Sequence, residues 1–263
     1  MEPLTPRQAD IMVLARQNGR VDVDGLALHF TVTPQTIRKD LNELCDRQLL
    51  NRMHGGATYP SGVTNYGYEA RRMLAADGKR RIGLKAAELI PDHSSIIINI
   101  GTTTEQVAMA LRRHTGIMVV TNNINAANIL REVPSAEVVI TGGLVRHADG
   151  GVVGEAAVDF IRQFRVDYAV IGASAIDADG TLLDFDFREV KVAQAIIETA
   201  RETILVADAM KFERKAPVRI GHLEQMDAFV TDEMPPQEII DICNAAGVKL
   251  VVAAAETEEK SVA

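Results

Sequence analysis

The sequence predicts an α/β protein made of a small helical N-terminal domain and a larger C-terminal domain built on a largely parallel sheet. Apolar residues recur at helical spacing up to about residue 44, and a glycine pair interrupts a strand-like stretch at 49–57. Beyond residue 92, short apolar runs alternate with helical segments. With 263 residues, 47% of them hydrophobic, the chain is long enough to bury one small and one medium core. We therefore expect two domains.

Composition and charge narrow the class of protein. No segment approaches the roughly 20 apolar residues that span a bilayer, and residues 1–10 lack a basic region leading into an apolar stretch, so we expect a cytoplasmic protein. Cys45 and Cys243 lie far apart without a CxxC spacing, which predicts neither disulfides nor a metal or cofactor site. The net charge of −8 argues against a generally basic surface, but residues 1–58 carry seven bases and seven acids. A local basic surface therefore remains possible.

Two helices are predicted before residue 31. The first covers residues 5–18, with Thr5 as its cap and Pro6 at its first position, where proline's missing N–H costs nothing. The second is a short helix opened by Val21 and Asp22, and a turn follows at residues 31–32.

A third helix is predicted from Thr33 to Leu44. Thr33 is its cap, and Ile37, Leu41 and Leu44 form an apolar face at positions i, i+4 and i+7. This face points inward, so the polar residues of the helix must face solvent or a ligand: Gln35, Thr36, Arg38, Lys39 and Asn42.

Two short helices and a tight turn before a helix with a polar face are typical of a winged helix-turn-helix DNA-binding domain. Gln35 and Thr36 are predicted to read bases, because glutamine pairs with adenine and the threonine methyl contacts thymine. Phosphate contacts are expected from Thr33, Arg38 and Lys39. On the wing, Arg52 and His54 are expected to add contacts to the DNA backbone or in the minor groove. The alternative is a three-helix packing module whose charged face is only solvated.

The C-terminal domain is predicted from seven short, β-branched apolar runs bounded by Gly, Asn or Asp, which are typical of buried parallel strands covered by helices on both faces. The runs are residues 95–100, 117–120, 137–140, 168–171, 203–206, 228–230 and 248–252. We expect domains at 1–58 and 79–263, joined by a linker at 59–78 that is rich in Gly, Pro and Ser.

An effector site is predicted at the carboxyl ends of these strands, where ligands bind in such sheets. Gly101, Thr102, Thr103 and Thr104 follow the first strand and open a helix, which makes an anion cradle. Residues at other strand ends, or with side chains that can bond the hydroxyls of a polyol, complete the predicted set: Thr121, Asn122, Gly142, Gly143, Asp177, Asp184, Glu189, Asp208 and Lys211. Taken singly, each of these residues is as readily explained by helix capping, turns or solvation.

The segment from Val32 to Leu41, followed by His54-Gly55-Gly56-Ala57, resembles the N-terminal domain of the DeoR family of transcription regulators. The resemblance continues through residues 79–232, whose family counterpart is an effector domain related to ribose 5-phosphate isomerase that binds phosphorylated sugars. Lys39 is a small departure, because the family often has arginine there.

Three segments, residues 150–155, 159–165 and 183–190, resemble family members that repress glycerol-utilisation genes. This resemblance implies a repressor that binds operator DNA as a homo-oligomer and leaves it when glycerol 3-phosphate binds. The alternative within the family is a repressor that responds to another sugar phosphate.

An enzyme is the alternative outside the family, because the related isomerase uses an Asp-Gly-Ala-Asp-Glu run after a strand to move protons. Here the run is Ile171-Gly172-Ala173-Ser174-Ala175, which lacks both leading acids, so we expect a binding protein without catalytic residues. A dinucleotide-binding protein is also disfavoured, because no GxGxxG follows the first strand.

Overall fold

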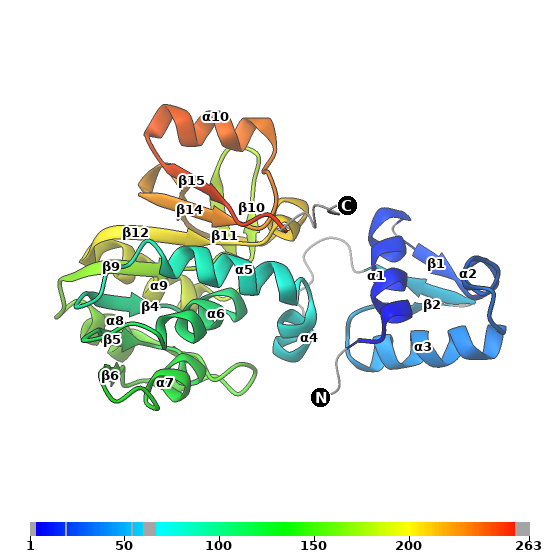
Figure 1. Ribbon diagram of the computed structural model, residues 1–263, viewed down its shortest axis with the longest axis horizontal. Helices are drawn as coiled ribbons and strands as arrows, with labels where there is room; N and C mark the ends of the chain where they lie inside the picture. Colours follow the sequence, from blue (N-terminus) through cyan, green and yellow to red (C-terminus); the bar gives the residue numbers. More distant parts are fainter. Residues whose placement is uncertain (1–3, 19, 54, 60–66, 256–263) are drawn as a thin grey trace, which may run out of the picture. The chain divides into compact units, whose positions relative to one another are not determined.

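The computed structural model describes residues 4–18, 20–53, 55–59 and 67–255. The chain divides into two compact units, unit 1 (residues 1–74) and unit 2 (residues 75–263), and Figure 1 shows their helices and strands. The division falls inside the expected linker, after helix α4 (Tyr68–Met73). Ala70 of this helix is 1% exposed because it packs into the core of unit 1.

Unit 1 is a winged helix-turn-helix domain. Its helices are α1 (Pro6–Asn18), α2 (Val23–Phe30) and α3 (Pro34–Asp46). Its antiparallel sheet has the order β1-β3-β2 and consists of β1 (Arg20–Asp22), β2 (Asn51–Met53) and β3 (Gly56–Thr58). The sequence pattern predicts the β2–β3 wing but not β1, which owes its strand conformation to pairing with β3.

Local side-chain bonds begin each of the three helices. The Thr5 hydroxyl accepts from the Gln8 amide at 3.2 Å, and the Asp22 carboxylate accepts from the Gly25 amide at 2.7 Å. The Thr33 hydroxyl accepts from Thr36 N at 3.2 Å. Each bond satisfies an amide that has no partner within its helix. The predicted helix starts at these positions are therefore confirmed.

The core of unit 1 forms where the apolar faces of its helices meet. Ile37 and Leu44 are 0% exposed and Leu41 is 4% exposed, as their spacing predicts. They pack with Ile11 of α1 and Leu26 of α2. Each such side chain contributes roughly 1.5–3 kcal/mol by leaving water. Burial of this face leaves the opposite face of α3 in solvent.

Unit 2 is built on one sheet of seven parallel strands in the order β15-β14-β12-β9-β4-β5-β6. The strands are β4 (Ser95–Ile98), β5 (Met118–Thr121), β6 (Glu137–Ile140), β9 (Val166–Ile171), β12 (Ala200–Val206), β14 (Ala228–Thr231) and β15 (Lys249–Val252). All seven predicted strands are confirmed, with ends that differ by a few residues.

Helices cover both faces of this sheet (Figure 1), which confirms the doubly wound arrangement. One face carries α5 (Ala76–Ala87), α6 (Thr102–Leu111) and α7 (Ile124–Leu130). The other carries α8 (Glu155–Ile161), α9 (Phe187–Thr199) and α10 (Gln237–Ala246). Strand side chains alternate between the two cores, so that Ile97 packs with α8 to α10 whereas Ile96 and Ile98 pack with α5 to α7.

The strand order reverses between β4 and β9, because β5 and β6 continue on one side of β4 and β12, β14 and β15 on the side of β9. Such a reversal opens a crevice at the carboxyl ends of the two central strands, where ligands of α/β sheets bind. The site in unit 2 is therefore expected around the residues that follow β4 and β9.

Smaller elements surround this edge. Two short strands form an antiparallel ribbon, and three others form a separate sheet that the sequence pattern does not predict. They are β7 (Leu144–Val145) and β8 (Val152–Val153), and then β10 (Ala175–Ile176), β11 (Thr181–Asp184) and β13 (Val218–His222). The 3₁₀ helices are η1 (Ala209–Glu213) and η2 (Leu223–Gln225).

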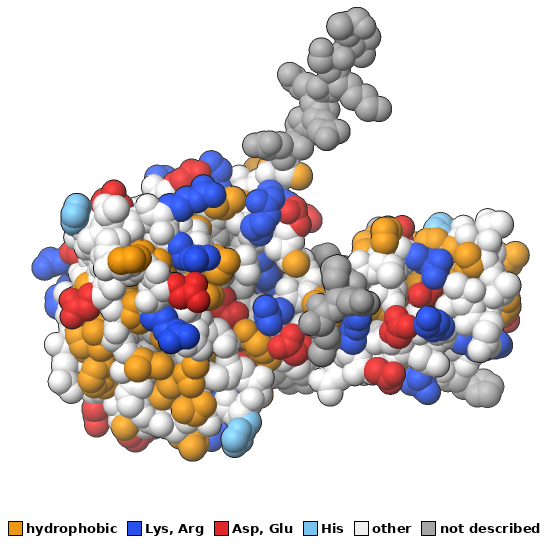
Figure 2. Space-filling model, turned by 60° about the horizontal axis from the view of Figure 1, so that its bottom comes forward, with side chains coloured by type: hydrophobic (Ala, Val, Ile, Leu, Met, Phe, Trp, Pro, Cys, Tyr) orange, Lys and Arg blue, Asp and Glu red, His pale blue; other side chains and the backbone are white. Residues whose placement is uncertain are grey.

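The surface is mixed in character. On the face shown in Figure 2, Lys and Arg side chains are scattered among acidic and apolar groups and form no continuous basic patch. Among the described residues, no helix combines the length and the apolar character needed to cross a membrane. The face shown in Figure 2 therefore offers no extended basic surface.

Candidate nucleic-acid interface and effector site

The outer face of α3 is the candidate DNA-reading surface. Gln35, Arg38 and Lys39 are exposed, and none of them bonds another described residue. Thr33 is exposed and Thr36 half-buried, and their hydroxyl oxygens lie 2.9 Å apart, so the cap at Thr33 also ties down the Thr36 hydroxyl. The polar groups of Gln35, Arg38 and Lys39 are thus available for base edges and phosphates.

The wing adds a second cation beside α3. Arg52 of β2 donates to Asn42 Oδ1 of α3 at 2.6 Å, and both side chains are exposed. Arg52 and Arg38 line one shallow groove between the helix and the wing. Gly55 makes the wing turn with φ +77°, a conformation that favours glycine. His54 lies outside the described residues.

Contacts from α1 fix the inner side of α3. Arg7 Nε donates to Asp40 Oδ2 at 2.6 Å, and Gln8 Nε2 donates to Glu43 Oε2 at 2.7 Å. The hydrogen bond with Asp40, opposed by burial, raises the pKa of the Arg7 guanidinium. These bonds hold α3 so that its outer face is presented in one orientation.

The start of α6 is the candidate anion cradle in unit 2. Gly101 directly precedes the helix, and no side chain caps this end. Thr102 and Thr103 are buried, whereas the Thr104 hydroxyl bonds the backbone oxygens of Asn99 and Gly101 at 2.7 and 2.8 Å. The uncapped backbone amides of the first turn therefore remain as anion-binding groups, while the Thr104 hydroxyl is used within the protein.

The ends of β5 and β6 lie beside this cradle in the sheet. The Thr121 hydroxyl donates to Ile98 O at 2.6 Å and accepts from Asn123 N at 3.0 Å, so its bonding capacity is used by the fold. Asn122 Nδ2 donates to Val152 O at 3.2 Å, but Asn122 Oδ1 is buried without a partner among the described residues. Gly142 and Gly143 follow β6 and are exposed.

Asp208 lies between two lysines at the end of β12. Its side chain is 2% exposed, and Lys79 Nζ and Lys211 Nζ each lie 3.9 Å from Asp208 Oδ2. Burial opposes ionisation of Asp208, but the ammonium groups of Lys211 and Lys79 outweigh it and lower the pKa of the carboxyl. The two ammonium groups therefore place two positive charges beside the buried Asp208 carboxylate.

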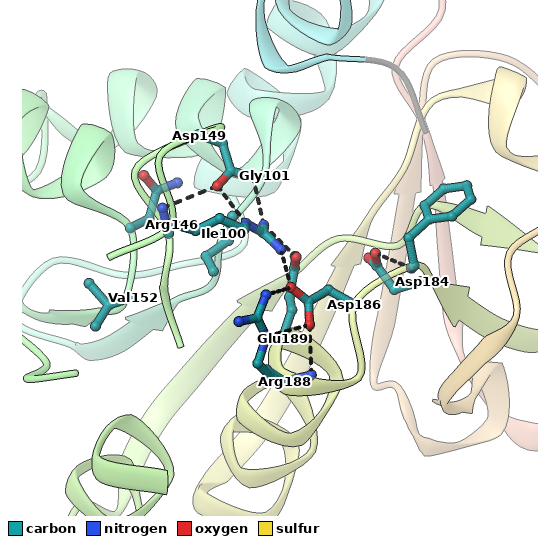
Figure 3. Close-up of polar contacts among 12 residues, drawn as sticks. Ile100, Gly101, Arg146, Asp149, Val152, Asp184, Asp186, Arg188 and Glu189 are labelled. Atoms are coloured by element: carbon teal, nitrogen blue, oxygen red, sulfur yellow. Dashed lines mark hydrogen bonds and ion pairs between the residues drawn. The ribbon is translucent and has the colours of Figure 1, made fainter. Parts of the chain in front are cut away.

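Glu189, predicted to bind an effector, is bonded instead within a charged cluster that Figure 3 shows. Arg146 Nη2 donates to Glu189 Oε2 at 2.6 Å and to Asp149 Oδ2 at 2.6 Å. Arg146 Nη1 donates to Asp186 Oδ2 at 3.2 Å, and Arg188 shares that carboxylate. Bonding to Arg188, opposed by burial and assisted by Arg146, lowers the pKa of Asp186 to about 2.

Two other predicted acids belong to the three-stranded sheet and its turn. Asp177 is exposed in the turn that joins β10 and β11. Asp184 is 9% exposed at the end of β11, where it accepts from the Phe185 amide at 2.6 Å. Ser174 N, which follows β9, donates to Leu183 O at 2.9 Å, so this end of β11 lies against the chain that leaves the parallel sheet. A role for the two acids in binding hydroxyls stays a prediction.

Two charged residues of this edge were missed by sequence reasoning. Lys79 lies on the buried face of α5 with Ile82, Gly83 and Ala86, and a lysine at that helical spacing is the signal that identifies it. Arg146 comes two residues after the exposed Leu144 in the ribbon, and no local pattern indicates its distant partners.

Taken together, the carboxyl edge of unit 2 can hold a small anion. It offers an uncapped helix start and two buried lysines. A Cβ on Gly172, just after β9, would lie 3.8 Å from the methyl carbon of Thr104, so the end of β9 is close to the start of α6. Among the described residues, no group of three or more His, Cys, Asp or Glu is arranged to hold a metal ion.

A winged helix-turn-helix domain joined to an α/β domain whose sheet edge carries a candidate anion site is typical of a ligand-responsive DNA-binding protein. Residues 7–63 match the DeoR-like helix-turn-helix domain, and residues 74–233 match the DeoR C-terminal sensor domain. The chain belongs to the DeoR family.

Similar proteins align over nearly the whole chain. The glycerol-3-phosphate regulon repressor of Escherichia coli is 45% identical over 238 residues, which is 90% of this chain and 94% of that protein. The protein of the same name from Haemophilus influenzae is 45% identical over 246 residues, 94% of this chain and 96% of that one. The HTH-type transcriptional repressor CsqR of Escherichia coli is 39% identical over 88% of each chain.

Solved structures match part of the chain at low similarity. Ribose 5-phosphate isomerase A from Neisseria gonorrhoeae matches with a TM-score of 0.39 and 14% identity over 55% of each chain. The eIF2B beta subunit from Chaetomium thermophilum matches with a TM-score of 0.47 and 15% identity over 65% of this chain and 54% of that one.

Proposed function

We propose that this protein represses genes of glycerol 3-phosphate utilisation and leaves its operator when glycerol 3-phosphate binds unit 2. The observation that supports the proposal is the exposed set Gln35, Arg38 and Lys39 on α3, whose side chains bond no other described residue. The chain is 45% identical over 90% of its length to a protein named glycerol-3-phosphate regulon repressor. A helix that exposes such a face from a packed scaffold is suited to the major groove.

On the operator, Gln35 and Thr36 contact base edges at the N-terminal end of α3, where recognition helices approach the bases. Arg38, Lys39 and Arg52 contact phosphates and fix the register of the helix. His54 belongs to the same proposed set on the wing. Helix-turn-helix regulators bind paired half-sites as dimers, so we include a homo-oligomer in the proposal.

In unit 2, the phosphate of the effector binds the first turn of α6, with Lys79 and Lys211 as counter-charges. Release of DNA requires that the ligand binds the DNA-free state more tightly than the DNA-bound state. A tenfold loss of operator affinity corresponds to about 1.4 kcal/mol of such preference.

Regulation, not catalysis, is the proposed activity. The similar proteins are named as repressors. Residues 171–175 contain no titratable side chain, so the acid and base that a sugar-phosphate isomerase needs have no counterpart in this run. Incubation with ribose 5-phosphate is expected to give no ketose; turnover at any rate above background contradicts this part.

The proposal is tested by fluorescence anisotropy with labelled promoter DNA from glycerol-utilisation genes, titrated with protein at several concentrations of glycerol 3-phosphate. We expect tight binding that weakens at least about tenfold at saturating ligand, with glucose 6-phosphate as the matched phosphate control. Operator affinity that stays constant across ligand concentrations overturns the induction claim, and equal binding to scrambled DNA overturns the operator claim.

A further inference from the structure

The chain between β6 and α8 folds over the carboxyl edge of the sheet as the β7–β8 ribbon, whose tip is residues 146–151. Two backbone bonds close the tip, from Arg146 N to Gly151 O at 2.8 Å and from Gly150 N to Arg146 O at 2.9 Å. The ribbon belongs to the β4–β6 half of unit 2, whereas α9 precedes β12 in the other half. A bond from the tip to α9 therefore spans the region where the strand order reverses.

Arg146 makes that bond. Its Nε and Nη2 donate to the two oxygens of Asp149 at 2.8 and 2.6 Å, within the tip. Toward α9, Nη2 donates to Glu189 at 2.6 Å and Nη1 to Asp186 at 3.2 Å (Figure 3). The Arg146 side chain is 17% exposed, so the guanidinium is within reach of a ligand that enters from solvent.

The tip of the ribbon lies next to the candidate cradle. A Cβ on Gly151 would be 2.5 Å from Ile100 Cδ1, so the tip touches the residue before Gly101. Gly151 N donates to Asp149 Oδ1 at 3.2 Å, and that same oxygen accepts from Arg146 Nε. On its other side, the tip is tied through Asn125, whose Nδ2 bonds Asp149 O and Glu105 Oε1 of α6, each at 3.0 Å.

Charge within the cluster favours an exchange of partners. Asp149, Asp186 and Glu189 supply three carboxylates against two guanidinium groups, those of Arg146 and Arg188. These carboxylates repel an anion at the cradle unless a cation turns toward it. A guanidinium binds phosphate through two parallel bonds and keeps its charge throughout, so Arg146 is suited to that movement.

We propose that a phosphate ligand in unit 2 is bound by Arg146 in exchange for its bonds to Asp186 and Glu189, so that α9 and the ligand compete for one guanidinium. This inference rests on the proposed function and adds its regulation: occupancy of the site releases the tip of the ribbon from α9. The bond between Arg146 and Asp149, both of which lie in the tip, is kept during the exchange.

If the ligand and α9 compete for Arg146, substitutions of the two partners in the Arg146–Glu189 ion pair should change ligand affinity in opposite directions. Glu189→Gln keeps an oxygen that accepts from Arg146 but removes the competing charge, so ligand binds roughly threefold more tightly or better. Asp186→Asn acts in the same direction and keeps a residue that caps α9. Arg146→Gln weakens binding about tenfold or more, because the ligand loses a charge-assisted partner.

The test is isothermal titration calorimetry of the full chain with glycerol 3-phosphate, and inorganic phosphate as a second probe. Glu155→Gln is the matched control, because it removes the carboxylate partner of another α9 residue, Lys191, at 2.8 Å in an exposed pair. Its affinity is expected to stay within about twofold of the wild type. Thermal unfolding of each variant checks that the fold is retained.

A fixed structural latch gives a different result, in which Glu189→Gln and Arg146→Gln both weaken binding, and that outcome overturns the exchange. If the wild type binds glycerol 3-phosphate but operator affinity does not respond, the proposed induction fails. The exchange at Arg146 is still tested, because calorimetry shows whether Glu189→Gln strengthens and Arg146→Gln weakens ligand binding. If the wild type binds neither probe, the role of Arg146 in ligand binding is overturned as well.

Discussion

The outer face of α3 and the carboxyl edge of the sheet in unit 2 are both polar, but they differ in what their side chains bond. On α3, Gln35, Arg38 and Lys39 are exposed and bond no other described residue. At the sheet edge, Arg146 makes four bonds to carboxylates, and the Thr104 and Thr121 hydroxyls bond backbone oxygens. DNA therefore meets a surface that is already formed, whereas an effector that binds through Arg146, as proposed above, must replace bonds that the protein makes to itself.

The largest expected effect comes from truncating a core side chain of α3, on the face opposite its exposed polar residues. Ile37→Ala leaves a cavity under α3, where the side chain is 0% exposed, and is expected to cost about 2–5 kcal/mol in the free energy of unfolding of unit 1. Urea denaturation followed by circular dichroism measures the loss. Ligand binding by unit 2, which has its own core, should be retained. Loss of both activities together contradicts this separation of the two units.

Lys211→Met tests the candidate effector site at the carboxyl edge of the sheet in unit 2. Lys211 is 8% exposed and close to Asp208, so its loss removes a counter-charge that we assign to the ligand's phosphate. Ligand affinity measured by calorimetry should fall by about 1.5–3 kcal/mol, while operator binding without ligand stays unchanged. Unaltered ligand affinity removes Lys211 from the site.

Two substitutions on α3 distinguish residues that read bases from residues that contact phosphates. Gln35→Ala should lose about 1–3 kcal/mol of discrimination between the operator and a base-substituted site. Lys39→Ala should weaken binding to all sequences and reduce the slope of log affinity against log salt by about 1. Anisotropy titrations at several salt concentrations measure both.

Arg20→Ala is the control for these two variants, because it removes one positive charge from an exposed position on β1, outside α3 and the wing. It should leave the salt slope as in the wild type. If Gln35→Ala and Lys39→Ala change specific and random DNA equally, the division between the two roles fails.

A smaller effect is expected from the cap of α3. Thr33→Ala removes the acceptor of the Thr36 amide and should cost about 1 kcal/mol in unit 1 stability. Thr33→Ser keeps the hydroxyl and should restore most of it. Thermal unfolding measures both variants, and equal stability of the two contradicts a capping role.

A last expected effect is a pH dependence confined to unit 2. Bonding to Arg188, opposed by burial and assisted by Arg146, places the pKa of Asp186 at about 2, below the roughly 3.9 of an unfolded aspartate. A depressed pKa adds stability above pH 4 that is lost as the pH falls from about 4 toward 2. In thermal unfolding, Asp186→Asn should therefore lose less stability than the wild type over this window, and parallel curves contradict it.

How far the sequence predicts this molecule depends on whether a feature is local. The strands and the recognition helix follow from repeating apolar positions such as Ile37, Leu41 and Leu44, because burial of one face imposes that repeat. Helix starts follow from residues three positions apart, as at Thr33 and Thr36. Most of the fold and the outer face of α3 are therefore readable from the sequence.

The hydrogen bonds at the carboxyl edge of the sheet in unit 2 cannot be predicted from the sequence in this way. Arg146 and Glu189 are 43 positions apart, and only the packing of the ribbon over α9 brings them together. A threonine at a strand end predicts a hydroxyl at the edge, but the direction of the hydroxyl depends on nearby carbonyls, as at Thr104 and Thr121. The assignments of effector-binding residues stay predictions for this reason.

The side chains of Gln35, Arg38 and Lys39 on α3 bond no other described residue, and this has a consequence for how such regulators evolve. Because Gln35 and Lys39 contribute no bond to the fold, a duplicated gene can change either residue, and with it the target site, at little cost in stability. A new effector demands coordinated change, because each substitution around Arg146 leaves a half-buried charge without its partner. Lineages of this fold should therefore diversify in operators more readily than in ligands.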